Sequence, residues 1–467
     1  MTRRRLTKRP RIKRMRINNL LNSFIFWGAW IIIPFIMEII PSIGSAIVLI
    51  KKRIKNYRPP KPQAYPEISL IIPVYNSSES LHDCIKSIHE STYDDNKIRV
   101  YLVNNRTKDD SFHVYTEAQK EFPTIRMQWL NARQGKSRAL NMALYNSTGK
   151  YIINIDSDGV LEKHALQNMV DLFESDHTIG CMTGAILTIP EQIEEYKHFF
   201  SRLLRQIEFV EYAEAFLAGR SYASENNNVY TLSGAFSAFR KSTVLKSRMY
   251  NTNTIAEDTQ ITFQMRYLMG QKVKVCDNAI YFVGPIEGMN KLYTQRQRWQ
   301  RGSLEVAKLF DSRSFRPIRI LRDVNVRTLI YDHTFAFPRV IWCLALLCLF
   351  LMGFSTTMIL YSTILVMVCY IIIAYLYYIS INMFLEEFPD IKKYYRTLWW
   401  VVPILPLFNV LTFFIRLTGI FNSMNTTSAW KTKTLSEEIE EYKEEVKAEA
   451  KKLTNISHKL YYFLNEP

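Results

Sequence analysis

Three groups of polar residues, far apart in the chain, have the types and spacing that reaction chemistry needs. Asp156 and Asp158 flank one serine directly after a short apolar run. A second acidic pair, Glu257 and Asp258, opens a stretch with helical periodicity, and the run Gln-Arg-Gln-Arg-Trp follows at 295–299. Together they indicate a site in which a divalent cation holds a nucleotide diphosphate and a carboxylate accepts a proton.

The pair Asp156 and Asp158 is the candidate metal site. In extended backbone, residues i and i+2 point to the same side, so the two carboxylates face one space. Neighbouring carboxylates repel a diphosphate unless a hard cation lies between them, which implies Mg²⁺ or Mn²⁺ as the cofactor. Such a cation offsets the charge on a departing nucleoside diphosphate. The alternative for an isolated Asp-x-Asp pair is a solvated acidic turn.

Asp258 is the candidate catalytic base, because its carboxylate can accept the proton of an attacking hydroxyl. Acidic residues also open helices for electrostatic reasons alone, and this is the alternative. A turn of small residues at Ser233 and Gly234 precedes it and would let an acceptor approach the backbone. Phe236 offers that acceptor an aromatic face.

Gln295, Arg298 and Trp299 recur at helical spacing within a basic stretch from 291 to 301. We expect Arg298 to meet the diphosphate and Trp299 to pack near the acceptor. An amphipathic helix of this composition also suits a membrane surface with anionic lipid. The two interpretations are compatible for one helix beside the site.

The segments expected to position these residues alternate between apolar runs typical of strands and apolar residues at helical spacing. Apolar runs typical of buried strands lie at 68–74, 99–103, 125–130 and 151–155, and helical spacing recurs at 81–88, 110–122 and 136–145. This alternation predicts an α/β fold with a mostly parallel sheet and right-handed crossovers. Ligands bind beyond the carboxyl ends of such strands, and these ends carry Tyr75, Asn105 and Asp156.

Nucleotide-binding motifs of other classes are absent or incomplete. The sequence has no Gly-x-Gly-x-x-Gly, which argues against a dinucleotide cofactor. Gly135 and Lys136 resemble the end of a phosphate loop, but that loop needs a glycine where Leu130 stands. Lys136 at a helix start can still meet a diphosphate or a carboxylate of the site.

Membrane-length apolar segments lie on both sides of this domain. The run from Val340 to Leu385 carries no Asp, Glu, Lys or Arg, which is room for two spanning helices with a turn near Gly353. The stretch at 397–415 contains two prolines and either spans with a kink or enters and leaves on one side. The N-terminal apolar run has basic residues at both ends, which favours a hairpin broken between Pro34 and Pro41.

The net charge of +17 is concentrated at the start, where nine of the first sixteen residues are Lys or Arg. Beside a membrane segment such an arm marks the cytoplasmic side and contacts anionic lipid rather than nucleic acid. The six cysteines lack metal-ligand spacing and are expected to be small buried residues in a reducing compartment. These features predict a multi-pass protein of the cell membrane with its catalytic domain in the cytoplasm.

The expected organisation has seven parts. They are a basic arm at 1–18, an N-terminal membrane segment (hairpin or span) at 19–50, a linker at 51–66, the catalytic domain at 67–290, interfacial helices at 291–335, C-terminal membrane helices at 336–421 and an amphipathic helical tail at 430–467. The tail either lies on the protein or membrane or contacts a protein partner.

With these residues in place, the chain resembles the family 2 inverting glycosyltransferases, and within them the processive membrane branch of cellulose, hyaluronan and poly-N-acetylglucosamine synthases. The resemblance covers about residues 67–305 and lies in the runs at 71–76, 135–141, 156–159, 233–235, 239–242, 257–258 and 295–299. The segment at 27–45 is similar to glycosyltransferases associated with exosortase G in Gram-positive bacteria.

The resemblance implies a GT-A type domain between N-terminal and C-terminal membrane helices. It implies a UDP-sugar donor and transfer to a growing cell-surface polysaccharide or glycolipid glycan, with Asp258 as base. The implied donor contacts are Pro73, Tyr75, Asn105, Lys136, Asp156 and Arg298, and the implied acceptor contacts are Ser233, Gly234, Phe236, Gln295 and Trp299.

One departure concerns the nucleotide base. The family usually has an Asp where Asn105 stands; the amide oxygen can still accept from a uracil N–H, without the charge. Two alternatives stay open at this point. One is transfer of a single sugar to a polyprenyl-phosphate carrier, and the other is a non-catalytic membrane scaffold with a degenerate transferase domain.

Overall fold

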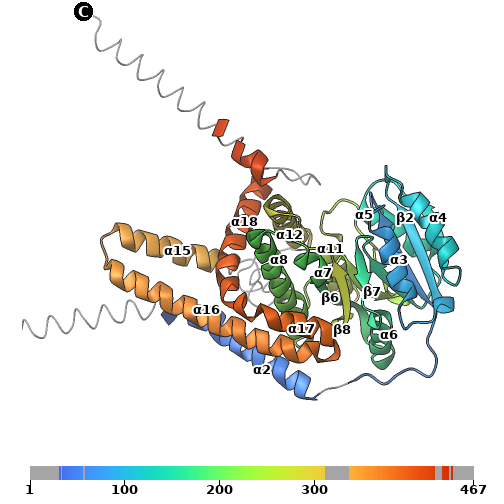
Figure 1. The fold of residues 1–467 in the computed structure, drawn as a ribbon, viewed down its shortest axis with the longest axis horizontal. Coiled ribbons are helices and arrows are strands. Elements are labelled where there is room, and N and C mark those ends of the chain that lie inside the picture. The colour runs from blue at the N-terminus through green and yellow to red at the C-terminus, as the bar shows by residue number, and fades with distance from the viewer. Residues whose placement is uncertain are drawn as a thin grey trace, which may run out of the picture.

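The computed structural model describes residues 31–32, 34–55, 58–310, 336–425, 434–440 and 443–444. The basic arm, the first part of the N-terminal apolar run, the second half of the interfacial segment and most of the tail lie outside these residues. An α/β domain stands at one end of the molecule and long apolar helices at the other (Figure 1).

Eight strands form one mixed sheet in the order β3-β2-β1-β4-β7-β6-β8-β5. They are β1 (Ile68–Val74), β2 (Ile98–Asn104), β3 (Arg126–Asn131), β4 (Tyr151–Ile155), β5 (Gly159–Leu161), β6 (Ile179–Thr188), β7 (Phe236–Arg240) and β8 (Lys272–Val283). The first four strands are parallel, whereas β7 runs antiparallel to β4 and β6. The predicted strands are confirmed, each within one residue at either end.

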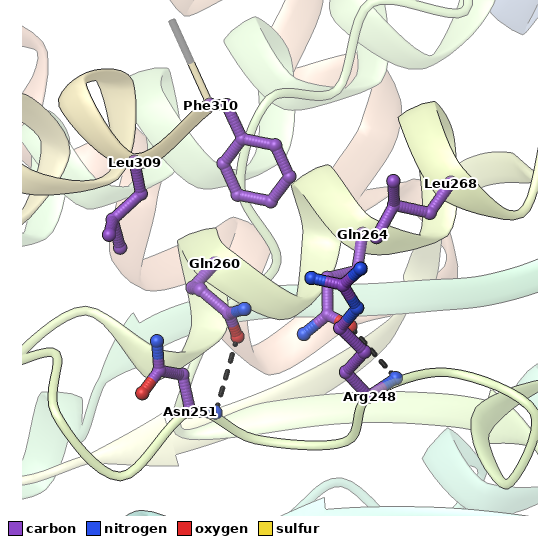
Figure 2. Close-up of a pocket in the computed structure, with 7 residues that line it drawn as sticks. All are labelled: Arg248, Asn251, Gln260, Gln264, Leu268, Leu309 and Phe310. Atoms are coloured by element: carbon purple, nitrogen blue, oxygen red, sulfur yellow. Dashed lines mark hydrogen bonds between the residues drawn. The ribbon is translucent and has the colours of Figure 1, made fainter. Parts of the chain in front are cut away.

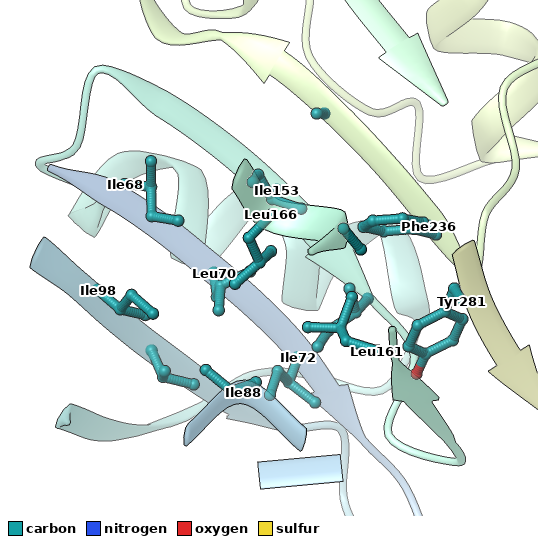
Figure 3. Close-up of a cluster of buried hydrophobic side chains, with 14 of the residues drawn as sticks. Ile68, Leu70, Ile72, Ile88, Ile98, Ile153, Leu161, Leu166, Phe236 and Tyr281 are labelled. Carbon is teal, nitrogen blue, oxygen red and sulfur yellow. The ribbon is translucent and has the colours of Figure 1, made fainter. Parts of the chain in front are cut away.

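The central strand β1 is buried on both faces, which explains its unbroken apolar run. Ile68, Leu70 and Ile72 pack with Ile98 and Leu166 on one side of the sheet (Figure 3). On the other side, alternate residues of the same strands pack against α5 (Lys136–Asn146). Helices α3 (Leu81–His89), α4 (Ser111–Glu121) and α6 (Ala165–Ser175) complete the first layer. Each fully buried Ile or Leu stabilises this core by about 1.5–3 kcal/mol.

A second group of helices lies between the sheet and the apolar helices (Figure 1). Among them are α7 (Pro190–Glu194), α8 (Phe199–Tyr212), α11 (Glu257–Phe263) and α12 (Met289–Phe310). The same part of the chain also forms the π-helical η3 (Ala213–Gly219), α9 (Arg220–Glu225), α10 (Lys241–Val244) and the π-helical η4 (Gln264–Leu268). Helix α12 therefore carries the predicted Gln-Arg-Gln-Arg-Trp run as one continuous helix.

The C-terminal apolar run forms α15 (Ala336–Leu351) and α16 (Thr356–Phe384), and Gly353 lies in the turn between them with φ +80°. The turn lies where it was predicted. After α17 (Pro389–Thr397) and two short 3₁₀ turns, α18 (Leu405–Asn425) follows. Pro406 stands in its first turn, where a missing N–H costs little. Among the described residues, Thr356–Glu387 and Val402–Ile420 are long and apolar enough to cross a membrane.

The predicted hairpin break between Pro34 and Pro41 is wrong. The π-helical η1 (Phe35–Ile39) continues directly into α2 (Ile40–Lys55) without a reversal. A proline inside a helix lacks the N–H for the ladder and crowds the carbonyl four residues earlier. The wider π turn before Pro41 accommodates both effects.

Helices α2 and α16 pack side by side and run in the same direction (Figure 1). Tyr370 Oη donates to the Glu38 carboxylate at 2.7 Å, and Ser45 Oγ hydrogen-bonds Tyr377 Oη. Both pairs have a sequence separation of 332, and the second follows the first by seven residues on each helix. Such heptad spacing is typical of a parallel helix pair. Both C-terminal ends therefore meet the α/β domain.

The described start of the tail lies on the protein itself. The Glu438 carboxylate accepts hydrogen bonds from Tyr293 Oη of α12 and from Asn422 Nδ2 of α18, the latter at 2.9 Å. Leu435 packs against the same helical group. The first turns of the tail thus join α12 to α18.

Candidate active site

The turn after β4 is held from several sides. Asp156 N–H donates to Ala235 O at 3.2 Å, and its carbonyl accepts from Tyr281 Oη. Ser157 Oγ lies 2.6 Å from Ser77 Oγ in the loop after β1. The position of the Asp156 and Asp158 carboxylates is therefore set by the sheet and by two neighbouring loops.

Lys136 lies at the centre of this edge of the sheet. Its Nζ donates to Asp156 Oδ1 at 2.5 Å and to Gly234 O at 3.3 Å, and it lies 3.8 Å from Glu257 Oε1. Burial by itself lowers the pKa of Lys136, but the carboxylates of Asp156 and Glu257 outweigh it and raise that pKa. The ammonium therefore stays charged and joins the ends of β4, α5 and α11.

Gly234 faces three ionisable side chains. A Cβ at this position would lie 3.3 Å from Asp258 Oδ2, 3.5 Å from Lys136 Nζ and 3.7 Å from Glu257 Oε1. Thr259 N–H donates to the other oxygen of Asp258, Oδ1, at 2.6 Å. The absence of a side chain at Gly234 lets the backbone lie close to a carboxylate oxygen and an ammonium.

Glu257, which opens α11 beside Asp258, is buried. Burial and the Asp258 charge raise the pKa of Glu257, although Lys136 opposes the effect. Sequence reasoning assigned Glu257 no role, and its contact with Lys136 became visible only in the fold. Glu257 contributes negative charge that holds the lysine in place.

Asn105 organises the loop before α5. Its Oδ1 accepts the Gly135 N–H at 2.6 Å, so one acceptor position of the amide is taken. Gly135 has φ +129°, a conformation that L side chains rarely adopt. Asn105 thus positions the start of α5, and through it Lys136.

The two predicted donor contacts at the end of β1 lie on the same edge of the sheet. Pro73 lies in β1 beside Val103 of β2, and Tyr75 follows the strand with an exposed ring.

Asp109 was missed by sequence reasoning. Its carboxylate accepts from Ser78 N–H at 2.8 Å, from Ser111 Oγ at 2.6 Å and from Thr107 Oγ1 at 2.6 Å. Burial opposes ionisation, but these hydrogen bonds hold the pKa of Asp109 well below its usual range. Asp109 ties the loop after β1 to the loop after β2. The Asp-Asp-Ser sequence before a helical stretch was the available signal.

Phe236 cannot serve as an aromatic face for an acceptor, and that prediction is wrong. Its side chain is fully buried, and its ring centroid lies 5.5 Å from that of Tyr281 (Figure 3). The reason is that Phe236 begins β7, pairs with Ile155 and points into the core. Ser233 is also buried, and its N–H donates to Thr183 Oγ1 at 3.0 Å.

The Gln-Arg-Gln-Arg-Trp run turns two of its residues inward. Arg296 is only 1% exposed, is paired with Glu211 and lies over the ring of Trp299. Gln297 Nε2 donates to Thr418 Oγ1 of α18 at 3.2 Å. These inward contacts, which sequence reasoning did not assign, fix α12 between α8 and α18.

The predicted residues of this run face outward or sideways. Arg298 and Trp299 are exposed, and Gln295 Nε2 donates to Tyr212 Oη at 3.3 Å. One turn later, a Cβ at Gly302 would lie 2.6 Å from the Ala256 Cβ. Because Ala256 immediately precedes Glu257, this close approach brings α12 against the start of α11.

The acidic pair after β4 fits a metal that arrives with a diphosphate. Asp156 and Asp158 supply hard oxygen ligands, and Mg²⁺ is commonly held by one or two carboxylates together with substrate phosphates. Within the described residues no group of three or more His, Cys, Asp and Glu side chains could hold an ion by itself. Burial and the Asp156 charge raise the pKa of Asp158.

A separate cavity of about 440 Å³ lies behind α11 (Figure 2). It is lined by Arg248, Asn251, Gln260, Gln264, Leu268, Leu309 and Phe310. Gln264 Oε1 accepts from Arg248 N–H at 3.0 Å, and Gln260 Oε1 accepts from Asn251 N–H at 3.4 Å. These amides brace the helix from the side opposite Asp258, and neither Lys136 nor Asp258 lines this cavity.

Comparisons with known proteins found relatives of the α/β domain. Residues 69–247 match the family model Glycosyl transferase family 2. Poly-beta-1,6-N-acetyl-D-glucosamine synthase of Staphylococcus aureus (strain COL) is 24% identical over 285 residues, which is 60% of this chain and 66% of that protein. The synthase of Staphylococcus epidermidis is 26% identical over 239 residues, 51% of this chain and 55% of that protein. The chain thus matches less than two thirds of the length of these relatives.

A solved structure shows the same fold. The mannosyltransferase of Pyrobaculum calidifontis in complex with GDP-Man and Mn²⁺ aligns with a TM-score of 0.55 and 16% identity, and the alignment covers 84% of this chain and 98% of that chain. The α/β domain is therefore GT-A-like, with a mostly parallel mixed sheet. Residues 69–247 of this chain are thus similar to glycosyl transferase family 2.

Proposed function

We propose that this protein is a membrane-integrated inverting glycosyltransferase that transfers a sugar from a UDP-sugar to a growing cell-surface polysaccharide or glycolipid glycan. The observation that carries the proposal is that Asp258 and Lys136 meet at Gly234, and that Lys136 in turn binds Asp156. The product class is supported by the names of the staphylococcal relatives, which are synthases of a polysaccharide. The narrower kinship with exosortase G-associated glycosyltransferases belongs to the same proposal.

Asp258 acts as the general base in this scheme. The oxygen of an acceptor hydroxyl attacks the anomeric carbon of the donor, and its proton passes to Asp258 Oδ2, the oxygen that faces Gly234. The bond between the anomeric carbon and the diphosphate oxygen breaks, and its electron pair leaves with UDP. A single displacement inverts the anomeric configuration. General base catalysis of this kind contributes about 10²–10⁴-fold to the rate.

The leaving diphosphate is met by positive charge at the other end of the cleft. Lys136 supplies an ammonium that is held 2.5 Å from Asp156 Oδ1, and Asp156 with Asp158 would hold Mg²⁺ or Mn²⁺. When bound, the metal neutralises the charge that develops on the diphosphate. Arg298 and Trp299 would close the cleft from α12, which the contact at Gly302 holds beside α11.

The proposed acceptor side faces the membrane. The described chain has two helices that qualify as membrane spans, and α12 lies against one of them, α18. A catalytic domain placed there would meet cytoplasmic UDP-sugars on one side and a lipid-borne or membrane-inserted glycan on the other. This arrangement supports extension of a surface glycan rather than modification of a soluble sugar.

The test is release of UDP by purified full-length protein, with Mn²⁺ and a panel of UDP-sugars and GDP-mannose. Asp258→Asn should lower turnover at least 100-fold without changing the melting temperature. Asp83→Asn, which neutralises an exposed carboxylate on α3, is the matched control. Turnover by Asp258→Asn equal to that of the control would refute the base assignment, and products limited to one added sugar would refute polymer extension.

A further inference from the structure

We propose that Lys51 and Lys55, at the C-terminal end of α2, bind the phosphate of an anionic phospholipid whose acyl chains lie along the isoleucines of the same helix. The proposal rests on the membrane integration proposed above. The proposed lipid site is separate from the residues proposed for sugar transfer.

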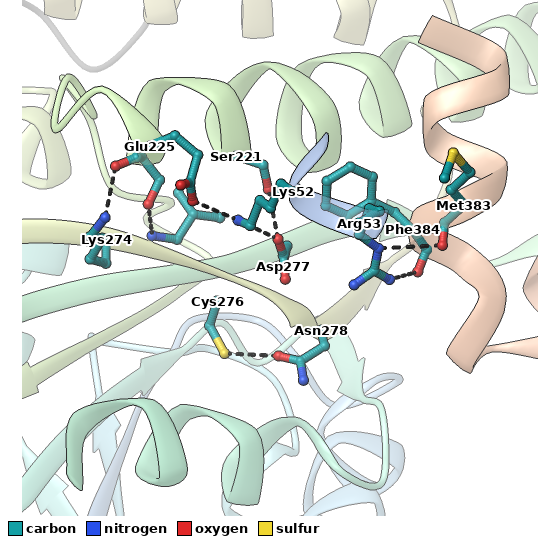
Figure 4. A network of polar contacts seen from close by, with 12 residues as sticks. Lys52, Arg53, Ser221, Glu225, Lys274, Cys276, Asp277, Asn278, Met383 and Phe384 are labelled. Carbon is teal, nitrogen blue, oxygen red and sulfur yellow. Dashed lines mark hydrogen bonds and ion pairs between the residues drawn. The ribbon is translucent and has the colours of Figure 1, made fainter. Parts of the chain in front are cut away.

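The four basic residues at the C-terminal end of α2 fall into two groups, and the first, Lys52 and Arg53, binds other parts of the protein. Lys52 Nζ pairs with Asp277 of β8 at 2.7 Å and with Glu225 of α9 at 3.1 Å (Figure 4). Arg53 donates to the carbonyls of Met383 and Phe384 at the C-terminal end of α16. These two cations are committed to protein partners and join α2 to the sheet and to α16.

Lys51 and Lys55 take no part in this network of contacts. Within the described part of the chain they form no ion pair, and both are exposed. They are four residues apart and therefore neighbours on the helix surface. Both line a cavity of about 420 Å³ that is also bordered by Lys52, Arg53, Glu225 and Asp277. The two carboxylates are the partners of Lys52, so positive charge exceeds negative charge around the cavity.

The same side of α2 is apolar above these lysines. Ile40, Ile43 and Ile47 are exposed and share the helix face of Lys51 by their spacing. The opposite face, with Ala46 and Leu49, is buried, and α2 packs there against α16. Because α16 meets the criteria of a membrane span, its parallel partner presents these isoleucines to hydrocarbon.

Length and charge together select a phospholipid as the occupant. From Ile40 to Lys51 the helix rises about 16 Å at 1.5 Å per residue, which is about half of a 30 Å hydrocarbon core. One leaflet thus covers the isoleucines and places its phosphate plane at the lysines. An apolar face that ends in two uncommitted cations complements a lipid with an anionic headgroup, and a soluble anion would leave the isoleucines uncovered.

The test is lipid binding by the full-length protein, measured by native mass spectrometry in detergent with added phosphatidylglycerol or phosphatidylcholine. Lys51→Gln/Lys55→Gln should weaken phosphatidylglycerol binding about 25-fold and leave phosphatidylcholine binding unchanged, because each of the two cations near an anionic lipid surface contributes about a factor of five. Lys86→Gln/Lys246→Gln removes the same charge from exposed positions of the catalytic domain and should bind like wild type.

Three outcomes would overturn the proposal. They are equal phosphatidylglycerol binding by the Lys51/Lys55 variant and the control, displacement of the lipid by millimolar inorganic phosphate, and unchanged binding by Ile43→Ser/Ile47→Ser. The measurement uses no nucleotide sugar, so it is independent of transferase activity. Loss of UDP release with intact lipid binding would refute the proposed function alone.

Discussion

Replacement of Lys136 by methionine tests whether this ammonium is the counter-charge of the catalytic cleft. The change keeps most of the side-chain volume and leaves Asp156, Glu257 and Asp258 around Gly234 without their cation. We expect a less stable protein whose deficit depends on pH and on divalent metal.

The magnitude follows from the distances. The Lys136 and Asp156 side chains are 19% and 29% exposed and 2.5 Å apart, and Glu257 lies 3.8 Å away. Breaking a buried pair by removal of one partner costs about 3–5 kcal/mol. Because the pair is partly open to solvent, we expect about 3 kcal/mol, which corresponds to a fall in melting temperature of about 6–12 °C for a domain of this size.

The pH dependence has a definite sign. The folded pKa of Lys136 is raised, so its stabilisation is complete at pH 7 and is lost only as the pH rises through the alkaline range. In Lys136→Met the carboxylates repel each other, and Glu257, whose pKa is already raised, takes up a proton more readily. The deficit should therefore be smaller at pH 5 than at pH 7.

The assay is thermal denaturation of purified full-length protein in EDTA and in Mn²⁺, at both pH values. Mn²⁺ should stabilise Lys136→Met more than wild type, since a second cation can then neutralise the carboxylates. Lys136→Arg, which keeps the charge, is the control and should recover most of the stability. A melting temperature for Lys136→Met within 2 °C of wild type in EDTA at pH 7 would show that the ammonium is not the counter-charge. A shift that small corresponds to a loss of stability of about 1 kcal/mol or less.

Three further predictions concern Glu208, Gly234 and Gly302. Burial raises the pKa of Glu208 to about 7, so wild type should lose up to about 3 kcal/mol of stability as the pH rises from 4.5 through 7. Glu208→Gln should remove this loss, and equal melting-temperature differences between the two proteins at pH 5 and pH 8 would contradict it. Gly234→Ala should keep the melting temperature but lower UDP release at least tenfold, because its methyl group would lie 3.3 Å from Asp258 Oδ2; full turnover would show that this space is not used. Gly302→Ala should cost about 1–3 kcal/mol by overpacking against Ala256, and Ala256→Gly should restore it; failure of this rescue in denaturation experiments would exclude the contact as the cause.

Local patterns were sufficient for much of the fold. Strands β1 to β4 and the turn at Gly353 lie where periodicity and composition predict them, because burial on one or both faces of an element leaves a period in its own residues. The carboxyl ends of these strands also predicted the edge at which Asp156 lies. The antiparallel strand β7 was not predicted, and with it the burial of Phe236 was missed.

The sequence by itself thus determined the family-typical residues, the α/β class and the membrane-length helices of this protein. The tertiary structure alone decided that Lys136 pairs with Asp156 and Glu257, that Arg296 rather than Arg298 is buried in α12, and that α2 lies parallel to α16. These outcomes depend on side chains that are from 20 to more than 300 positions apart in the chain. The hydrophobic periodicity of a single helix or strand does not indicate such a pairing, because the contact forms only when the sheet and the helices pack together.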